Sequence, residues 1–183
     1  AGCVSSTPTV FWNFNMPYLE WTDALALDLP AMDDTHREFV DLLAVVDAAP
    51  DDTLLTHWAA LIDHTDDHFG REDDWMQATR FASSNCHSMQ HKVVLQVMRE
   101  GLTRGQAGDL AVVRQMSHEL AMWFPQHAQA MDASLALHLR RIGFDPVTGV
   151  VSLPDALPKD LIHGCGGACS DGESADAPAT ATA

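Results

Sequence analysis

Four long stretches between residues 31 and 142 place apolar residues every three or four positions, and this period limits the possible fold more than any other feature. In the first stretch, Phe39, Leu43 and Val46 fall on one face of a helix. No part of this region alternates between apolar and polar residues as a strand does. Short turns join the stretches, so the four amphipathic helices can bury their apolar faces only against one another. The sequence therefore predicts an all-α protein, folded as an up-down-up-down four-helix bundle.

Turn-forming and capping residues set the expected ends of these helices. Pro50 ends the first helix, and the acidic pair that follows it suits the first turn of the second. A Ser-Ser-Asn turn at residues 83–85 precedes the third helix, and Asp109 is a good cap for the fourth. We expect helices at about residues 33–48, 52–79, 86–104 and 109–142, the last of them interrupted at Pro125.

The two ends of the chain differ in composition from the bundle. Residues 1–30 are rich in aromatic and turn-forming residues, which predicts an N-terminal arm packed on the bundle. We divide the chain into an N-terminal extension at 1–18, a bundle domain at 19–142 and an irregular to disordered C-terminal tail at 143–183. Within the tail, we expect residues 143–163 to pack irregularly on the bundle and residues 170–183 to be disordered.

The charge of the chain argues against two classes of partner. Ten Lys and Arg stand against 26 Asp and Glu, a formal charge of −16. Such a surface repels phosphate backbones and anionic lipids, so we expect neither nucleic-acid nor membrane binding. No stretch approaches the roughly 20 apolar residues that span a bilayer, and no signal peptide is visible at the start. We therefore expect a cytoplasmic protein, and the sequence leaves the identity of any protein partner open.

Histidines and carboxylates at helical spacing form the main candidate site. His68 and Glu72 lie four residues apart in the second helix, as do His87 and His91 in the third. This spacing places each pair on one helix face, one turn apart, where both members can reach one metal ion. His36 lies in the first turn of the first helix. A single histidine of this kind usually faces solvent, but ligands on every helix predict a shared metal site.

The fourth helix supplies its ligands at a less regular spacing. His127 and Asp132 lie five residues apart, roughly 140° around a regular α-helix. They can share a metal site only if the helix is locally distorted. Pro125 offers a cause for such a distortion, because it removes a backbone hydrogen bond and clashes with the preceding turn.

The order of these residues resembles the hemerythrin family. The resemblance covers about residues 19–139 and rests on His36, His68-Phe69-Gly70-Arg71-Glu72, His87-Ser88-Met89-Gln90-His91, and Trp123-Phe124-Pro125-Gln126-His127 with Asp132. The long gap between His91 and His127 is similar to that of the prokaryotic single-domain members. The resemblance implies two iron ions per chain, joined by an oxo or hydroxo bridge. It further implies that His87, His91 and His127 hold one iron, that His36 and His68 hold the other, and that both carboxylates bridge them.

Reversible dioxygen binding is the function that the resemblance implies, for oxygen storage, delivery or sensing. Imidazoles and carboxylates without thiolates suit iron or manganese better than structural zinc. The chain has no Glu-x-x-His pair of the kind that di-iron oxygenases and ferritins use. Two alternatives stay open: a di-iron enzyme acting on peroxide or nitric oxide, and a regulatory module that responds to redox state or oxygen. Four aromatic residues are candidates for a dry oxygen pocket, although ordinary core packing explains each one alone: Phe39, Phe69, Trp123 and Phe124.

Other histidines and cysteines carry weaker expectations. His64 lies one turn before His68 and either supports the site or is a partly exposed histidine. We expect His57, His118 and His138 to face solvent. The glycine-rich tail segment that contains His163, Cys165 and Cys169 has three open interpretations: a flexible linker, a redox-active thiol pair or a second metal site.

Overall fold

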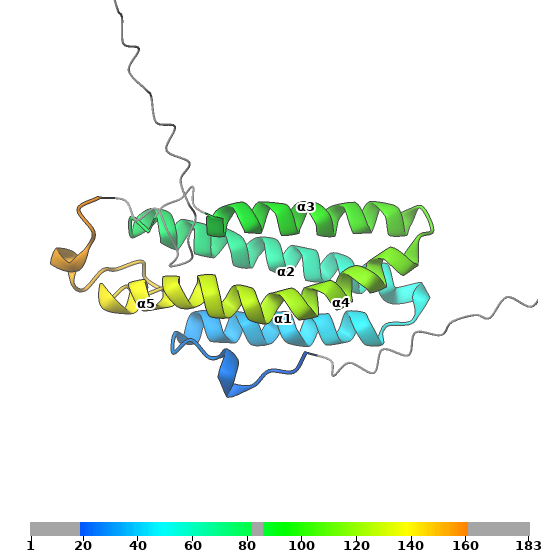
Figure 1. Cartoon of the computed structure of the whole chain (residues 1–183), viewed down its shortest axis with the longest axis horizontal. Helices are drawn as coiled ribbons and strands as arrows, with labels where there is room; N and C mark the ends of the chain where they lie inside the picture. Colours follow the sequence, from blue (N-terminus) through cyan, green and yellow to red (C-terminus); the bar gives the residue numbers. More distant parts are fainter. Residues whose placement is uncertain (1–18, 82–85, 161–183) are drawn as a thin grey trace, which may run out of the picture.

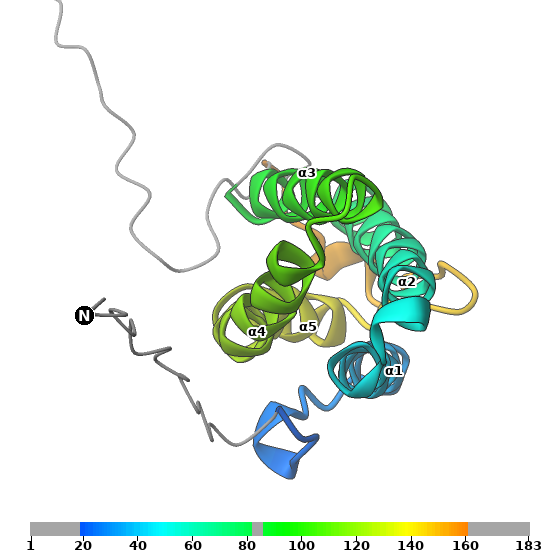
Figure 2. The same cartoon turned by 90° about the vertical axis from the view of Figure 1, so that its right-hand side faces the viewer.

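The computed structural model describes residues 19–81 and 86–160, and these residues form the predicted all-α bundle. Its helices are α1 (Pro30–Ala48), α2 (Asp51–Ala78), α3 (Cys86–Gln106), α4 (Leu110–His127) and α5 (Ala133–Arg141). A π-helical segment, Ala128–Asp132, joins α4 to α5, so that the two continue as one rod. Each helix packs on its neighbours in the order α1, α2, α3, α4 and back to α1 (Figures 1 and 2).

The first helix begins at Pro30, three residues before the expected start at Asp33. Proline is favoured in the first helical turn, because its missing N–H has no partner there in any case. The carboxylate of Asp33 accepts hydrogen bonds from the backbone N–H groups of Leu27 and Leu29, at 2.7 and 3.2 Å. Asp33 therefore lies inside the helix and ties the preceding arm to it.

The fourth helix is interrupted, but not at the expected residue. Pro125 lies inside α4, and the irregular segment begins three residues later, at Ala128. Proline removes only one hydrogen bond here, since the N–H of Ala128 still bonds the carbonyl oxygen of Phe124. The N–H of Ala133 then bonds the carbonyl oxygen of Ala128, the i to i+5 pattern of a π-helix.

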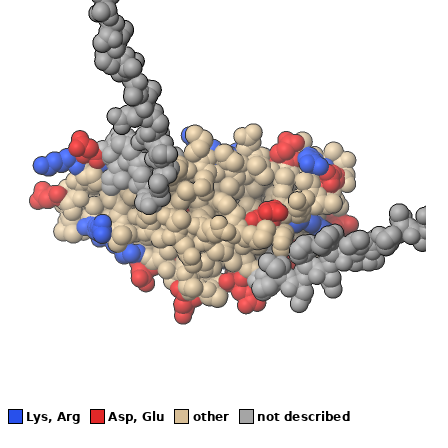
Figure 3. All heavy atoms as spheres, in the orientation of Figure 1, with Lys and Arg blue, Asp and Glu red and all other residues tan. Residues whose placement is uncertain are grey.

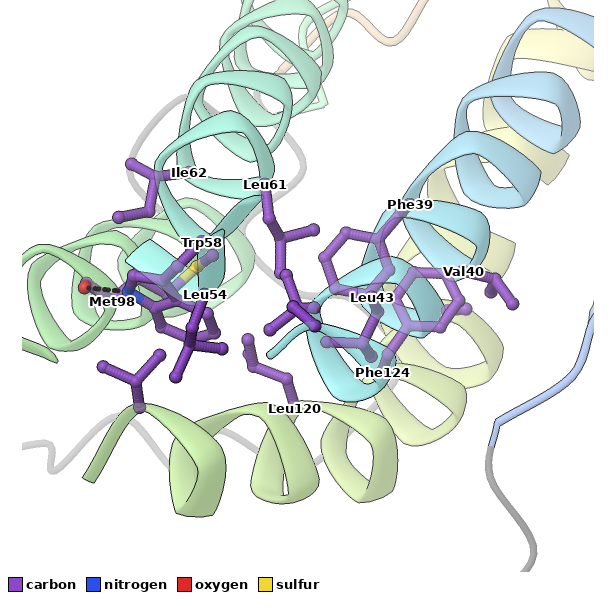
Figure 4. Packing of buried hydrophobic residues seen from close by; sticks show 14 of the residues in the cluster. Phe39, Val40, Leu43, Leu54, Trp58, Leu61, Ile62, Met98, Leu120 and Phe124 are labelled. Carbon is purple, nitrogen blue, oxygen red and sulfur yellow. Dashed lines mark hydrogen bonds between the residues drawn. The ribbon is translucent and has the colours of Figure 1, made fainter. Parts of the chain in front are cut away.

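Two apolar clusters fill the bundle. The first contains the fully buried Trp58, whose Nε1–H donates to the carbonyl oxygen of Met98 at 3.0 Å (Figure 4). The second lies at the other end of the bundle and includes Met76 and Leu139. Along α1, α2 and the α4–α5 rod, the candidate ligands fall between residues of the two clusters. We call this stretch of buried polar side chains the polar layer; it comprises His36, His68, Glu72, His87, His91, His127 and Asp132.

Residues 143–160 follow α5 without a long helix. Phe144 is buried in the second cluster and forms an isolated antiparallel bridge with Val151. A short 3-10 helix, Pro154–Ala156, follows. No helix within the described residues is long and apolar enough to cross a membrane. The expected extension at 1–18, the turn at 83–85 and the tail beyond residue 160 lie outside the described residues, as do His163, Cys165 and Cys169.

Candidate metal centre

All seven predicted ligand side chains meet in the polar layer. One group of donors that could hold a metal ion consists of Glu72, His87, His91, His127 and Asp132, and a second consists of His36, His68 and Glu72. The side chains come from α1, α2, α3, the end of α4 and the π-helical segment, and none is more than 3% exposed. Glu72 belongs to both groups, which places two candidate metal positions next to each other.

Each carboxylate directs its two oxygens to different sets of histidines. Oε1 of Glu72 lies 3.1 Å from Nε2 of His68, whereas Oε2 lies 3.4 Å from Nε2 of both His87 and His91. A carboxylate in this position can join two metal ions, one on each oxygen.

The two oxygens of Asp132, at the end of the π-helical segment, are likewise directed to different histidines. Its Oδ2 lies 3.3 Å from Nε2 of His36, and its Oδ1 lies 2.9 and 3.2 Å from Nε2 of His87 and His127. Each carboxylate therefore has one oxygen toward the pair His36 and His68. Its other oxygen lies toward the set of His87, His91 and His127.

The chemistry of these donors fits a bound cation. Oε2 of Glu72, both oxygens of Asp132, and Nε2 of His91 and His127 are buried and make no hydrogen bond within the described part of the chain. Buried polar atoms of this kind are costly unless something pairs with them. Carboxylate oxygens and imidazole nitrogens that converge on one point meet this need by coordinating a metal ion.

The π-helical segment brings the two ligands of the last helix together. A regular α-helix would separate His127 and Asp132 by more than a quarter turn. Since the i to i+5 hydrogen bonds of the π-helix add one residue to the turn, the two side chains point the same way. π-Helical turns are frequent at functional sites.

Two hydrogen bonds orient ligand imidazoles from behind. Nδ1 of His91 lies 3.1 Å from Oδ1 of Asp73, and Nδ1 of His127 lies 3.3 Å from Oε1 of Gln90. Each contact fixes the ring with its Nε2 toward the other donors. Metal-binding histidines in proteins usually have such a partner on their outer nitrogen.

Aromatic rings enclose the polar layer on the side of the first cluster. Phe69 stacks on His91 with ring centroids 3.9 Å apart, and Trp123 stacks on His127 at 4.4 Å. The rings of Phe124 and His36 are perpendicular, with centroids 5.1 Å apart, and Phe39 in turn stacks on Phe124 at 4.6 Å. All four aromatics proposed from the sequence therefore lie at or next to the ligands.

The histidines around Glu72 and Asp132 favour the ionised form of both carboxylates. Burial and the nearby Asp132 charge act to raise the pKa of Glu72, but His68 and His87 outweigh them and hold that pKa well below its ordinary value. Burial likewise opposes ionisation of Asp132, yet His127, His36 and His87 hold its pKa well below the usual range. Burial acts against the charged form of His36 and His91, but contacts with Asp132, Asp73 and Glu72 raise the pKa of both imidazoles, so their protons balance the carboxylate charges. A bound cation would replace these protons.

Comparison with known proteins decides the family. Residues 27–137 match the family model described as the hemerythrin HHE cation binding domain, and this range contains all seven side chains of the polar layer. The chain belongs to the hemerythrin family.

Curated hemerythrins of bacteria align with most of the chain. A bacteriohemerythrin of Ralstonia nicotianae is 37% identical over 130 residues, which cover 71% of this chain and 95% of that relative. Bacteriohemerythrins of Stenotrophomonas maltophilia and Pseudomonas paraeruginosa are 24% and 25% identical, over 66% and 64% of this chain and 81% and 79% of each relative. No solved structure matches the chain. The likeness to bacterial hemerythrins confirms the resemblance that the ligand motifs indicated.

Three polar residues of this hemerythrin do not follow the sequence expectations. Asp73 and Gln90 were missed as partners of ligand histidines, although each lies next to a ligand in the chain. His138 was expected to face solvent, and this expectation was wrong: it is 8% exposed, and its Nε2 lies 3.0 Å from the carbonyl oxygen of Thr79. His64 is half-buried, with its Nε2 3.2 Å from the carbonyl oxygen of Thr35 and its ring 6.3 Å from that of His68 between centroids.

Proposed function

We propose that this hemerythrin binds dioxygen reversibly at a non-haem di-iron centre in the polar layer. His87, His91 and His127 hold one iron in this proposal, and His36 and His68 hold the other, with Glu72 and Asp132 bridging both. The observation that carries the proposal is the division of each carboxylate, with one oxygen toward each set of histidines.

The two sides of the site differ in their number of protein donors. Three imidazoles face one position and only two face the other, while the bridging carboxylates are shared. A small molecule can therefore bind on the side of His36 and His68, where one protein donor fewer is available. Two ferrous ions bound here would supply the electrons that dioxygen needs to bind tightly.

The residues around His36 and His68 favour reversible binding of dioxygen over catalysis. His36 is fully buried beside Phe124, and Phe69 lies 5.4 Å from His68 between ring centroids. Rings in these positions exclude water and proton donors, which slows irreversible oxidation of the site. The donor set leaves little space for a second, larger substrate.

A spectroscopic experiment tests this function. The iron-loaded, reduced protein is examined anaerobically, then in air, and then after removal of oxygen, with metal analysis of the same sample. We expect two irons per chain and a visible band that appears in air, persists, and disappears when oxygen is removed. A band that bleaches rapidly while added peroxide or nitric oxide is consumed would instead indicate an enzyme, and one metal ion per chain would contradict the di-iron site.

A further inference from the structure

An apolar groove runs between α3 and α4 on the outside of the bundle. Its volume is about 210 Å³, and all but one of its lining residues are apolar: Val93, Val94, Val97, Met98, Met116, Glu119, Leu120 and Trp123. Val93 and Val97 are 52% and 47% exposed, and Met89 continues the same face of α3 at 60%. Figure 3 shows few charged side chains at the centre of this face. We call this surface the α3–α4 groove.

The groove reaches the polar layer through one side chain. Trp123 lines the groove and also stacks on His127, with an angle of 27° between the rings. A cavity of about 150 Å³ can hold a benzene ring, so the groove has room for an aromatic side chain. Large contiguous apolar patches on a protein surface mark sites of interaction.

The N-terminal extension of the same chain has the composition that fits the groove. Residues 1–18 contain no Asp, Glu, Lys or Arg, although a fifth of the whole chain is charged. They include four aromatic residues within eight positions: Phe11, Trp12, Phe14 and Tyr18. An uncharged segment approaches Glu119 at the edge of the groove without repulsion. A second copy of this chain, with its own charge of −16, would be repelled.

The extension also joins the bundle, at residue 19, within reach of the groove. Leu19 and Trp21 pack against the first cluster, to which Leu120 and Phe124 of α4 contribute. The ring of Trp21 lies 4.6 Å from the guanidinium carbon of Arg37 on α1, so the arm is anchored beside α1 and α4. In Figure 2, α4 lies between this arm and α3, and a helix with its side chains is about 10 to 12 Å across. Eight extended residues span about 25 Å, which is enough to carry Phe11 and Phe14 across.

We propose that residues 10–18 of this chain lie in the α3–α4 groove, with their aromatic side chains against Trp123. Because the segment is covalently joined to the bundle, its docking is intramolecular. The effective concentration of the segment is then in the millimolar range. The segment then shields the stacked Trp123 and His127 rings from water. This inference concerns the surface of the bundle and does not depend on which ligand the metal centre binds.

Photo-cross-linking in the full-length protein tests the proposal. A variant with p-benzoylphenylalanine in place of Phe14 is irradiated, and the products are separated by mass and mapped by mass spectrometry. We expect cross-links within one chain, at monomer mass, to groove residues of α3 and α4 such as Val97 and Met116. Cross-links that join two chains, or that map outside the groove, would overturn the proposal, the first of these in favour of a second copy.

A matched pair of substitutions gives the second measurement. Val97→Glu places a charge in the groove, whereas Val45→Glu makes the same change on α1, where Val45 is 44% exposed. We expect the cross-link yield from position 14 to fall several-fold in the first variant and to stay unchanged in the second. Equal yields in both variants would overturn the proposal, because docking would then not depend on the groove.

Discussion

His127 and Asp132 lie five residues apart on one rod, yet Nε2 of the first is 3.2 Å from Oδ1 of the second. The π-helical segment between them makes this contact possible, since a regular helix would point the two side chains in different directions. The same contact links the histidines on one side of the polar layer to a carboxylate that also reaches His36.

Removing a carboxylate should disturb the metal centre more than removing a histidine. Glu72→Ala and Asp132→Ala each delete a donor shared by both proposed metal positions, so we expect most of the iron to be lost. His36→Ala removes a donor from one position only, and about half of the iron should remain. Metal analysis of the purified variants measures this, and equal loss in all three would show that the carboxylates do not bridge.

The Asp73 carboxylate should tighten metal binding through His91. Asp73→Asn weakens the contact that orients the imidazole, and losses of about 10- to 100-fold in metal affinity are typical of such changes. Asp74→Asn is the matched control, because Asp74 is the exposed neighbour of Asp73. Competition with a chelator gives both affinities. If the two variants behave alike, the hydrogen bond to His91 has no role in metal binding.

The metal-free protein should lose stability in acid. A carboxylate whose pKa is lower in the folded protein stabilises the fold above its unfolded pKa, and this contribution disappears as the pH falls toward the folded pKa. The ordinary pKa values are 4.5 for Glu72 and 3.8 for Asp132, and both are lowered by the fold. Urea unfolding should therefore show stability decreasing below about pH 4.5. Asp132→Asn should flatten this decrease, and an unchanged pH profile in that variant would contradict the prediction.

Phe69 should protect the metal centre from water. Phe69→Leu removes the ring that stacks on His91, and we expect the visible band in air to bleach several-fold faster at unchanged iron content. Phe81→Leu is the control, since Phe81 is equally buried but packs on His138 in the second cluster. Both substitutions remove part of a buried ring and leave a cavity of similar size, so they should lower the free energy of unfolding by a similar amount, about 1 to 3 kcal/mol. Equal bleaching rates would leave Phe69 with a packing role alone.

Two glycines should respond in opposite ways to alanine. A Cβ added at Gly105 would lie 2.5 Å from Cδ2 of Leu55 and 3.0 Å from Cγ2 of Val113, whereas nothing lies within 4 Å of one added at Gly70. We expect Gly105→Ala to lower the free energy of unfolding by roughly 1 to 2 kcal/mol through overpacking. Gly70→Ala should raise it by up to about 1 kcal/mol, because alanine favours the helix. Denaturant unfolding distinguishes these signs, and stabilisation by both would contradict the close packing at Gly105.

The sequence predicted those parts of the site that depend on regular helical spacing. His68 with Glu72, and His87 with His91, follow from the period of an α-helix, and the structure brings them together as expected. The contact of His127 with Asp132 requires a break in that period, and the position of the break did not follow from Pro125.

Contacts between distant parts of the chain were harder to predict. The side chain of Gln90 contacts His127, which lies 37 residues later in the chain. The carbonyl oxygen of Thr79 contacts His138, which lies 59 residues later. No local pattern in the sequence indicates either pair, since such contacts depend on how one helix is rotated against another. The sequence therefore predicts which residues lie on one face of a helix better than it predicts which side chains of another helix meet them.

The polar layer divides the core of the bundle into two apolar halves. Trp58 and its neighbours fill one half, while Met76 and Leu139 belong to the other, and between them lie charged and hydrogen-bonding groups that contribute little cohesion without a cation. Without a bound cation, we expect the two halves to differ in local stability, which hydrogen exchange would measure. Metal ions at both positions would together join all four helices, since the donors of one position come from α2, α3 and the end of α4 and those of the other from α1 and α2. In a cell, chains that have failed to acquire metal would be the first substrates of proteases, so that degradation itself selects for the loaded protein.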